Sequence, residues 1–323
     1  MSTSDKIIAF IKEKGQVKGL DIASHLGITR QALFKHLPKL LASGVITKIG
    51  KPPKVFYFIN KKIEPSRDYI LSEEIKKKII QNFLVITPAG EKKEGLEGFV
   101  YWCDKYNLPI EKTAVEYVRT LSKYSDYQKN GYINGTSKLI NSFKDVYLDE
   151  VLYLDFYSIE RFGKTKLGQL LLYAKQSQNV SLMKEIIEII RPKIEQIIKI
   201  FKIDGIGFIP PTVKREKQLI KFFEKELSGN LRKLEITKIS TPISIPQKTL
   251  NKLEDRIENA RNTIVVSDDS SFSNILLIDD AVGSGATLNE TAKKIRNKKI
   301  CSGKIIGLAI TGSFKGFDVI SEI

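Results

Sequence analysis

Cysteine, histidine, methionine and tryptophan are scarce in this chain. Its 323 residues include two cysteines, two histidines, two methionines and one tryptophan. Cys103 and Cys301 stand far apart, which argues against a disulfide framework and indicates a reducing environment. No apolar run reaches the roughly 18 residues that a membrane-spanning helix needs, and the run from Ile7 to Ile11 is too short for a secretory signal. We therefore expect a cytoplasmic protein with no membrane partner.

Acidic residues are fewer than basic ones, and the imbalance is uneven. The formal net charge is +16, which alone is compatible with a nucleic acid, a membrane surface, an anionic metabolite or simple solubility. Residues 1–62 hold eleven lysines and one arginine against three acidic residues, so more than half of the excess lies in under a fifth of the chain. This concentration indicates an anionic partner for the amino-terminal segment in particular.

The amino-terminal segment has the pattern of three short helices followed by a hairpin. The three helices and the two strands are expected at residues 5–14, 19–28, 30–42, 45–49 and 55–59. Gly15 is placed to end the first helix, and Thr29 is a suitable N-cap for the third. Ser43-Gly44 would end the third helix, and Pro38 inside it is expected to kink it or to end its regular part early.

Three helices, a glycine turn between the last two, and a basic hairpin resemble a winged helix-turn-helix domain, which we assign to residues 1–64. The segment from Ile28 to Leu37 resembles the recognition helix of bacterial repressors, whose exposed residues near the helix start contact base edges. The resemblance implies that base edges are contacted by Thr29, Arg30, Gln31 and Lys35. It implies that phosphates are contacted by Lys48, Lys51 and Lys54 on the hairpin. Winged helices also serve as protein–protein modules, and the local charge favours double-stranded DNA.

Residues 65–180 show mainly helical patterns and no sustained strand alternation. The polar segment around Pro65 is typical of a linker. Helices are expected at residues 73–85, 93–106, 110–124 and 168–178. No catalytic motif stands out in this region. The polar cluster between Asp155 and Lys166 is a candidate ligand site, although a surface loop joining two helices is the favoured interpretation.

From residue 181 the pattern changes to helices alternating with strands. Apolar residues recur every three or four positions from Met183 to Phe201, which favours core packing over a dimer seam. Candidate strands follow at residues 205–209, 234–239, 263–266, 275–278 and 304–311. Alternation of this kind predicts an α/β fold with a doubly wound parallel sheet over residues 181–323.

The candidate strand at residues 275–278 leads into the most informative segment of the chain. Asp279 and Asp280 follow it directly, and then come a loop of glycine and serine and a helix expected to begin near Ala286. Glycines let the backbone approach a phosphate, and a helix N-terminus offers N–H groups and partial positive charge. Neighbouring carboxylates can accept hydrogen bonds from two sugar hydroxyls or hold a metal. This order suits a sugar phosphate.

The same segment resembles the phosphoribosyl pyrophosphate (PRPP) motif of type I phosphoribosyltransferases. The resemblance implies that Asp279 and Asp280 contact the ribose 2′- and 3′-hydroxyls, while the backbone after them and the Ser284 and Thr287 hydroxyls hold the 5′-phosphate. The implied PRPP-binding residues of this segment are Asp279, Asp280, Ala281, Val282, Gly283, Ser284, Gly285, Ala286 and Thr287. Mg²⁺ is expected to come with PRPP near the two aspartates, and no protein-only metal site is predicted. The alternative interpretation is a polar turn after a core strand.

A second block resembles the competence protein F (ComF)-like group of that family. An apolar segment ending in Pro210 precedes the basic pair Lys214-Arg215, and a Pro-Gln-x-x-Leu segment from Pro246 precedes Arg256-x-x-Asn259. The resemblance implies that Lys214 and Arg215 lie near the pyrophosphate, with a solvated helix start as the alternative. It also implies that residues 241–262 form a hood over the site, in which Arg256 and Asn259 are expected to support the hood, with ligand contact as the alternative.

Two departures from the ComF-like group bear on function. Its members often carry a zinc-binding cysteine cluster before this domain, and the two isolated cysteines here cannot build one. The basic segment continues from Arg215 as Glu-Lys-Gln and lacks the Gly-Phe-Asn that the group has before its glutamine. Substrate handling at this segment therefore differs from the pattern of the group.

These patterns lead to two principal functional hypotheses. The first is a DNA-binding transcription regulator that senses PRPP or a related nucleotide, an architecture that resembles the purine-repressor type of Gram-positive bacteria. A homodimer is expected, because such repressors read two-fold sites. The second hypothesis is an active phosphoribosyltransferase that transfers phosphoribose to a nitrogen nucleophile, with the winged helix as an accessory module. A role in DNA uptake is a third, suggested by the ComF resemblance alone.

Overall fold

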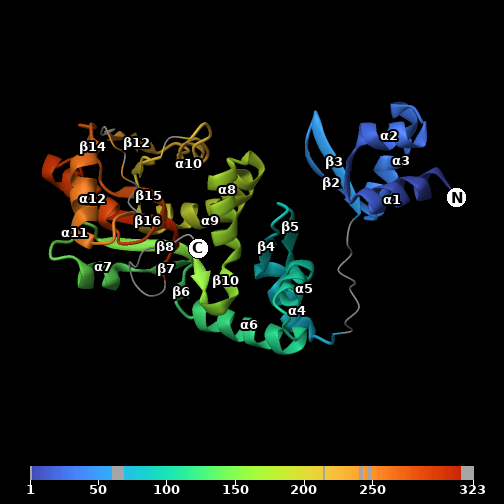
Figure 1. The fold of residues 1–323 in the computed structure, drawn as a ribbon. Coiled ribbons are helices and arrows are strands. Elements are labelled where there is room, and N and C mark those ends of the chain that lie inside the picture. The colour runs from blue at the N-terminus through green and yellow to red at the C-terminus, as the bar shows by residue number, and fades with distance from the viewer. Residues whose placement is uncertain are drawn as a thin grey trace. The chain divides into compact units, whose positions relative to one another are not determined.

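A computed structural model describes residues 2–59, 69–213, 215–239, 243, 245 and 249–313, except for the side chain of Lys51. The chain divides into two compact units. The amino-terminal unit comprises residues 1–70 with 87–91, and the carboxyl-terminal unit comprises residues 71–86 with 92–323. Figure 1 follows the elements of both units along the chain.

The amino-terminal unit packs three helices against a small antiparallel sheet. The helices are α1 (Thr3–Lys14), α2 (Gly19–Leu26) and α3 (Arg30–Ala42). The sheet has the order β1-β3-β2, with bounds Gln16–Lys18, Lys54–Ile59 and Ile46–Lys51. Its core includes the fully buried side chains Ile7, Ile11, Ile22, Leu33, Leu37 and Ile46. The expected helices and hairpin are confirmed, whereas β1 was not predicted, because three residues show no period of their own.

Local signals fix the ends of these helices. Gly15 and Gly27 end α1 and α2 with positive φ angles of 75° and 60°, which glycine adopts without strain. The Thr29 side chain accepts a hydrogen bond from the backbone N–H of Ala32, as an N-cap does. The expectation that Pro38 ends the regular part of α3 early is wrong, because the helix continues to Ala42. Leu37 and Leu40, on either side of the proline, are buried and hold the helix against the core.

A seven-stranded, mostly parallel sheet is the centre of the carboxyl-terminal unit. The order is β12-β11-β15-β16-β8-β7-β6, in which the first five strands are parallel and the last two pair antiparallel. In that order the bounds are Arg232–Leu234, Gly205–Phe208, Ile275–Val282, Ile305–Gly312, Glu150–Phe156, Tyr132–Asn134 and Gln128–Lys129. The α/β class is therefore confirmed for this unit.

Helices cover this sheet and continue beyond it. They are α4 (Glu73–Asn82), α5 (Gly95–Lys105), α6 (Ile110–Ser125), α7 (Thr136–Ser142), α8 (Lys166–Ser177), α9 (Val180–Phe201), α10 (Leu219–Leu227), α11 (Leu253–Thr263) and α12 (Ala286–Lys298). The apolar stripe of α9 is buried with side chains of α8, α10 and the sheet in one hydrophobic cluster. The prediction of core packing for this stripe is confirmed.

Three short two-stranded sheets complete the unit. They are β4 (Leu84–Ile86) with β5 (Lys92–Glu94), β9 (Ser158–Ile159) with β10 (Gly163–Lys164), and β13 (Ile236–Lys238) with β14 (Ile264–Val266). The strand expected at 234–239 is thus divided between two sheets at Glu235. The strand expected at 263–266 pairs antiparallel with β13, outside the main sheet. Periodicity finds a strand but does not choose its neighbour.

The main sheet also takes strands from the stretch that the sequence indicated to be mainly helical. β8, β7 and β6 lie between residues 128 and 156, and β8 pairs in parallel with β16. β8 is apolar at almost every position because both of its faces are buried. Such a strand shows no alternation, which is why the pattern from Glu150 to Phe156 was not recognised.

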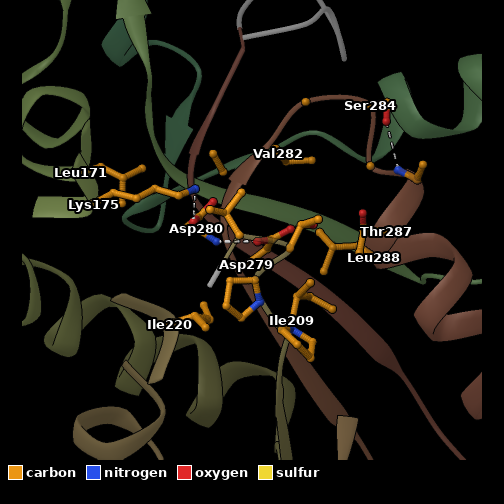
Figure 2. Close-up of a pocket in the computed structure, with 18 of the residues that line it drawn as sticks. Leu171, Lys175, Ile209, Ile220, Asp279, Asp280, Val282, Ser284, Thr287 and Leu288 are labelled. Atoms are coloured by element: carbon orange, nitrogen blue, oxygen red, sulfur yellow. Dashed lines mark hydrogen bonds and ion pairs between the residues drawn. The ribbon is translucent and has the colours of Figure 1, made fainter. Parts of the chain in front are cut away.

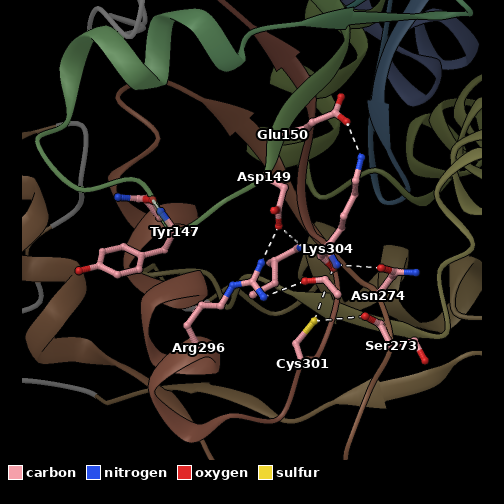
Figure 3. A network of polar contacts seen from close by, with 11 residues as sticks. Tyr147, Asp149, Glu150, Ser273, Asn274, Arg296, Cys301 and Lys304 are labelled. Atoms are coloured by element: carbon pink, nitrogen blue, oxygen red, sulfur yellow. Dashed lines mark hydrogen bonds and ion pairs between the residues drawn. The ribbon is translucent and has the colours of Figure 1, made fainter.

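A polar network fastens the amino ends of the central strands, as Figure 3 shows. The Asp149 carboxylate accepts hydrogen bonds from the backbone N–H of Ile305 at 2.6 Å and from the Arg296 guanidinium at 2.6 Å. The Asn274 side chain accepts from the backbone N–H of Lys304 at 2.8 Å. These hydrogen bonds join the segments before β8, β15 and β16, so the amino ends of these three strands are linked by side chains of the protein itself.

Candidate functional site

A topological switch point lies at the carboxyl ends of the strands, opposite the polar network. β11 and β15 are adjacent and parallel, yet the chain leaves β11 toward β12 on one side and leaves β15 toward β16 on the other. The loops that follow the two strands therefore diverge and leave a crevice at the carboxyl ends, where open α/β sheets bind ligands. A cavity of about 250 Å³ lies there, lined by residues 209–213 after β11 and by residues 279–288.

The predicted PRPP-binding residues come together in this cavity. All nine residues from Asp279 to Thr287 line it, and so does Arg215. Lys214 lies outside the described residues. Residues 241, 242, 244 and 246–248 of the expected hood also lie outside them, whereas Arg256 lines the cavity. The structure thus brings the motif residues to one site, and the identity of the ligand stays a prediction.

The strand before the loop is longer than its apolar run suggested. β15 continues to Val282, and Asp279, Ala281 and Val282 pair with Ala309, Thr311 and Gly312 of β16. The two aspartates are therefore held on a strand, and the loop is reduced to residues 283–285. Pairing with β16 sets this boundary, and the local sequence does not show it.

The short loop and the start of α12 form a candidate anion site. Gly285 caps α12 with φ 78°, a left-handed conformation that favours glycine. The Ser284 hydroxyl accepts a hydrogen bond from the backbone N–H of Ala286 at 3.3 Å. The first turn of an α-helix has N–H groups without partners within the helix, and residues 286–288 of that turn line the cavity. A phosphate is suited to this position.

The two carboxylates differ in their surroundings. Burial and the adjacent Asp280 raise the pKa of Asp279 to about 7, although Lys175 and Lys238 oppose the rise. Asp280 has a direct counter-ion, because its Oδ2 lies 2.5 Å from Lys175 Nζ. Figure 2 shows Lys175 reaching the aspartates from α8, beside Leu171. The pair thus combines one carboxylate that is ion-paired with Lys175 and one whose pKa burial raises.

Two of the cations at this site have no local signal in the sequence. Lys175 lies on α8 and Lys238 on β13, far from the motif in sequence, and both line the cavity with Arg215 and Arg256. Lys238 donates a hydrogen bond to the Thr212 hydroxyl at 2.6 Å, and burial lowers its pKa while Asp279 partly offsets this. Four cationic side chains and two carboxylates thus line one cavity, a balance that favours a ligand with several negative charges.

One of these cations has a structural role as well. Arg256 is buried, and its Nε donates a hydrogen bond to the backbone carbonyl of Leu250 at 2.7 Å. This contact agrees with the prediction that Arg256 supports the segment over the site. Because Arg256 also lines the cavity, it can contact a ligand while it makes this structural hydrogen bond.

The polar cluster between Asp155 and Lys166 is mostly paired within the protein. Glu160 pairs with Lys123, Arg161 with Glu116 and Lys166 with Glu94. The pairing leaves these charges engaged within the protein, but the expected loop between two helices is wrong, because the segment joins β8 to α8 and contains β9 and β10. Tyr157 is different, because it lines the cavity together with Leu171 and Leu172 of α8 and gives it an apolar wall.

The predicted DNA-binding residues lie on α3 and on the β2–β3 hairpin of the amino-terminal unit. Arg30, Gln31 and Lys35 are exposed on one face of α3, with Phe34 59% exposed between them. Thr29 is exposed and also caps α3, and Lys48 and Lys54 are exposed on the hairpin. The backbone of Lys51 belongs to β2, and its side chain is outside the description. These positions form a basic, accessible surface.

The two histidines make packing contacts. His25 stacks on Phe10 with ring centroids 3.9 Å apart, and His36 Nδ1 lies 3.1 Å from the Ser4 hydroxyl. Within the described part of the chain no group of three or more His, Cys, Asp or Glu side chains is placed to hold a metal ion. Across the same residues, no helix has both the length and the apolarity that crossing a membrane requires.

Comparison with known proteins leaves the family open. No protein-family model matches this chain, and no curated protein matches it in sequence. The functional argument therefore depends on the site itself.

Proposed function

We propose that the protein is a DNA-binding regulator whose carboxyl-terminal unit binds PRPP or a related phosphoribosyl nucleotide as an effector. The observation that carries this proposal is the cavity at the switch point, where Asp279 and Asp280, the N-terminus of α12 and several cations face one space. The amino-terminal unit is the DNA-binding part, and the ligand changes its affinity for DNA.

The chemistry of the cavity supports PRPP part by part. The carboxylates of Asp279 and Asp280 suit the ribose 2′- and 3′-hydroxyls, which donate hydrogen bonds. The loop at Gly285 and the first turn of α12 suit the 5′-phosphate. The cations Lys175, Lys238 and Arg215 suit the pyrophosphate. A Mg²⁺ ion carried by the pyrophosphate fits two neighbouring carboxylates, because this ion is usually held by one or two carboxylates and substrate phosphates.

The surface of the amino-terminal unit supports DNA as its partner. Arg30, Gln31 and Lys35 are side chains that hydrogen-bond to base edges, and they are exposed along one helix face. Lys48 and Lys54 on the hairpin suit phosphates. A homodimer that reads a two-fold operator stays part of this proposal.

The experiment that tests the proposal selects duplex fragments from the source genome with the full chain, at physiological salt, with and without PRPP and Mg²⁺. A ligand changes DNA affinity only by its differential binding to two states of the protein. We expect enrichment of a discrete site whose affinity shifts with PRPP. No enrichment under either condition would refute DNA recognition and leave the ligand site as the functional part.

A second candidate function is phosphoribosyl transfer. Asp279, whose pKa burial raises to about 7, would lie beside the expected ribose and suit proton transfer, and the apolar wall of Tyr157, Leu171 and Leu172 suits a flat base. The test is release of pyrophosphate from PRPP in the presence of adenine, guanine, uracil or glutamine. Turnover with any of these acceptors would show that the site is catalytic and would refute the proposal that it only senses PRPP.

A further inference from the structure

One cation of the cavity is paired with a carboxylate that the proposed ligand also needs. Lys175 Nζ lies 2.5 Å from Oδ2 of Asp280, the carboxylate that is also expected to accept a hydrogen bond from a ribose hydroxyl. We propose that Lys175 exchanges partners, leaving Asp280 and contacting the pyrophosphate when PRPP binds. This inference rests on the proposed function, and it makes Lys175 the residue that distinguishes PRPP from ribose 5-phosphate.

The environment of Lys175 keeps it charged and accessible. Its side chain is 34% exposed, against 18% for Asp280. Burial disfavours the charged form, but Asp280 and Asp279 outweigh this effect and raise the pKa of Lys175 above its usual value. Leu171 lies one helical turn earlier on α8 and lines the same cavity, so the stem of Lys175 runs along apolar surface while its ammonium group faces the site.

The expected orientation of the ligand leads to the same lysine. C1 and C4 flank the ring oxygen of ribose and C5 is attached to C4, so a 5′-phosphate at the α12 loop leaves the C1 substituent on the other side of the ring from that loop. In Figure 2, Lys175 approaches Asp280 from the side opposite to Ser284 and Thr287. The pyrophosphate on C1 therefore extends toward Lys175.

A neighbouring cation strengthens this argument. The positive charge of Arg215 acts against that of Lys175, so the two groups repel each other in this part of the cavity. A pyrophosphate between them would relieve the repulsion and replace the carboxylate that Lys175 gives up. The flexible four-carbon stem of lysine allows its ammonium group to move between the two partners while α8 stays in place.

The test compares two ligands on one variant. Calorimetric titration of the full chain with PRPP and with ribose 5-phosphate, both with Mg²⁺, is performed on the wild type and on Lys175→Met. Because a hydrogen bond to a charged group is lost, we expect PRPP affinity to fall about tenfold or more. Ribose 5-phosphate has no pyrophosphate and gains a free Asp280, so its affinity is expected to stay unchanged or to rise. Lys184→Met, at an exposed position on α9, is the matched control and is expected to leave both affinities unchanged.

The possible results separate the inference from the proposed function. If the wild type binds neither ligand, both fail. If the wild type prefers PRPP and Lys175→Met keeps the same preference, the partner exchange is wrong while PRPP binding stands. Should the methionine variant melt at a clearly lower temperature, Lys175→Gln takes its place, because its amide can still donate to Asp280 without the charge. An unchanged preference in that variant is likewise evidence against the exchange.

Discussion

A single methyl group at the start of α8 is expected to disturb both the fold and the ligand site. Gly168 lies so close to Tyr157, the residue between β8 and β9, that a Cβ atom there would be 2.2 Å from the Tyr157 backbone oxygen, against an ordinary contact of 3.4–4 Å. The opposing atom belongs to the backbone, so α8 or the end of β8 must shift. Alanine normally stabilises a helix interior by about 0.5–1 kcal/mol relative to glycine, whereas overpacking costs about 1–3 kcal/mol. Gly168→Ala is therefore expected to be net destabilising.

Urea denaturation and thermal melting measure this effect, with about 2–4 °C lost per kcal/mol in a unit of this size. Because Tyr157 and Lys175 line the cavity, PRPP affinity should fall in the same variant. Gly19→Ala is the matched control, since a Cβ there meets side-chain atoms no closer than 3.6 Å. If Gly168→Ala were as stable as the wild type and bound PRPP equally well, the close packing of α8 on Tyr157 would be refuted.

Three further predictions address the cap of α3, the amino edge of the sheet and the paired carboxylates. Thr29→Ala removes the acceptor for the Ala32 N–H and should destabilise the amino-terminal unit by about 1 kcal/mol in denaturant titration, whereas Arg30→Ala should weaken DNA binding in gel shifts and leave stability unchanged. Although burial opposes it, hydrogen bonds from two backbone N–H groups and an arginine hold the pKa of Asp204 below its usual value. The stability lost in Asp204→Asn should therefore be seen at neutral pH and disappear in urea titrations as the pH falls below about 4. Asp280→Asn should weaken PRPP binding about tenfold or more in calorimetry, and an unchanged affinity would remove this carboxylate from the ribose site.

Much of the local structure was predictable because it is encoded by neighbours in the sequence. The N-cap Thr29, the stop at Gly15 and the beginning of α12 at Ala286 are set by side-chain hydrogen bonds and backbone freedom within a few residues. The order of strand, carboxylates, glycine loop and helix predicted that the motif residues lie at one strand-to-helix connection. In the structure these residues line one cavity. Each of these features lies within one short segment.

Other features were decided by contacts between distant segments. β8 was missed because a strand buried on both faces has no alternation, and its pairing with β16 across some 150 residues defines it. Lys175 and Lys238 have no local mark of function, since a lysine on an amphipathic helix or a short strand is ordinary.

The sequence by itself therefore determined the helices and hairpin of the amino-terminal unit, the starts of α3 and α12, and the order of residues in the candidate phosphate-binding motif. Only the tertiary structure decided where β15 ends, which strands flank it, and that Lys175 pairs with Asp280. The physical reason is the separation along the chain over which each interaction acts. Capping and periodicity act over one or two turns of chain, whereas an ion pair or a strand pairing depends on which distant surfaces bury each other.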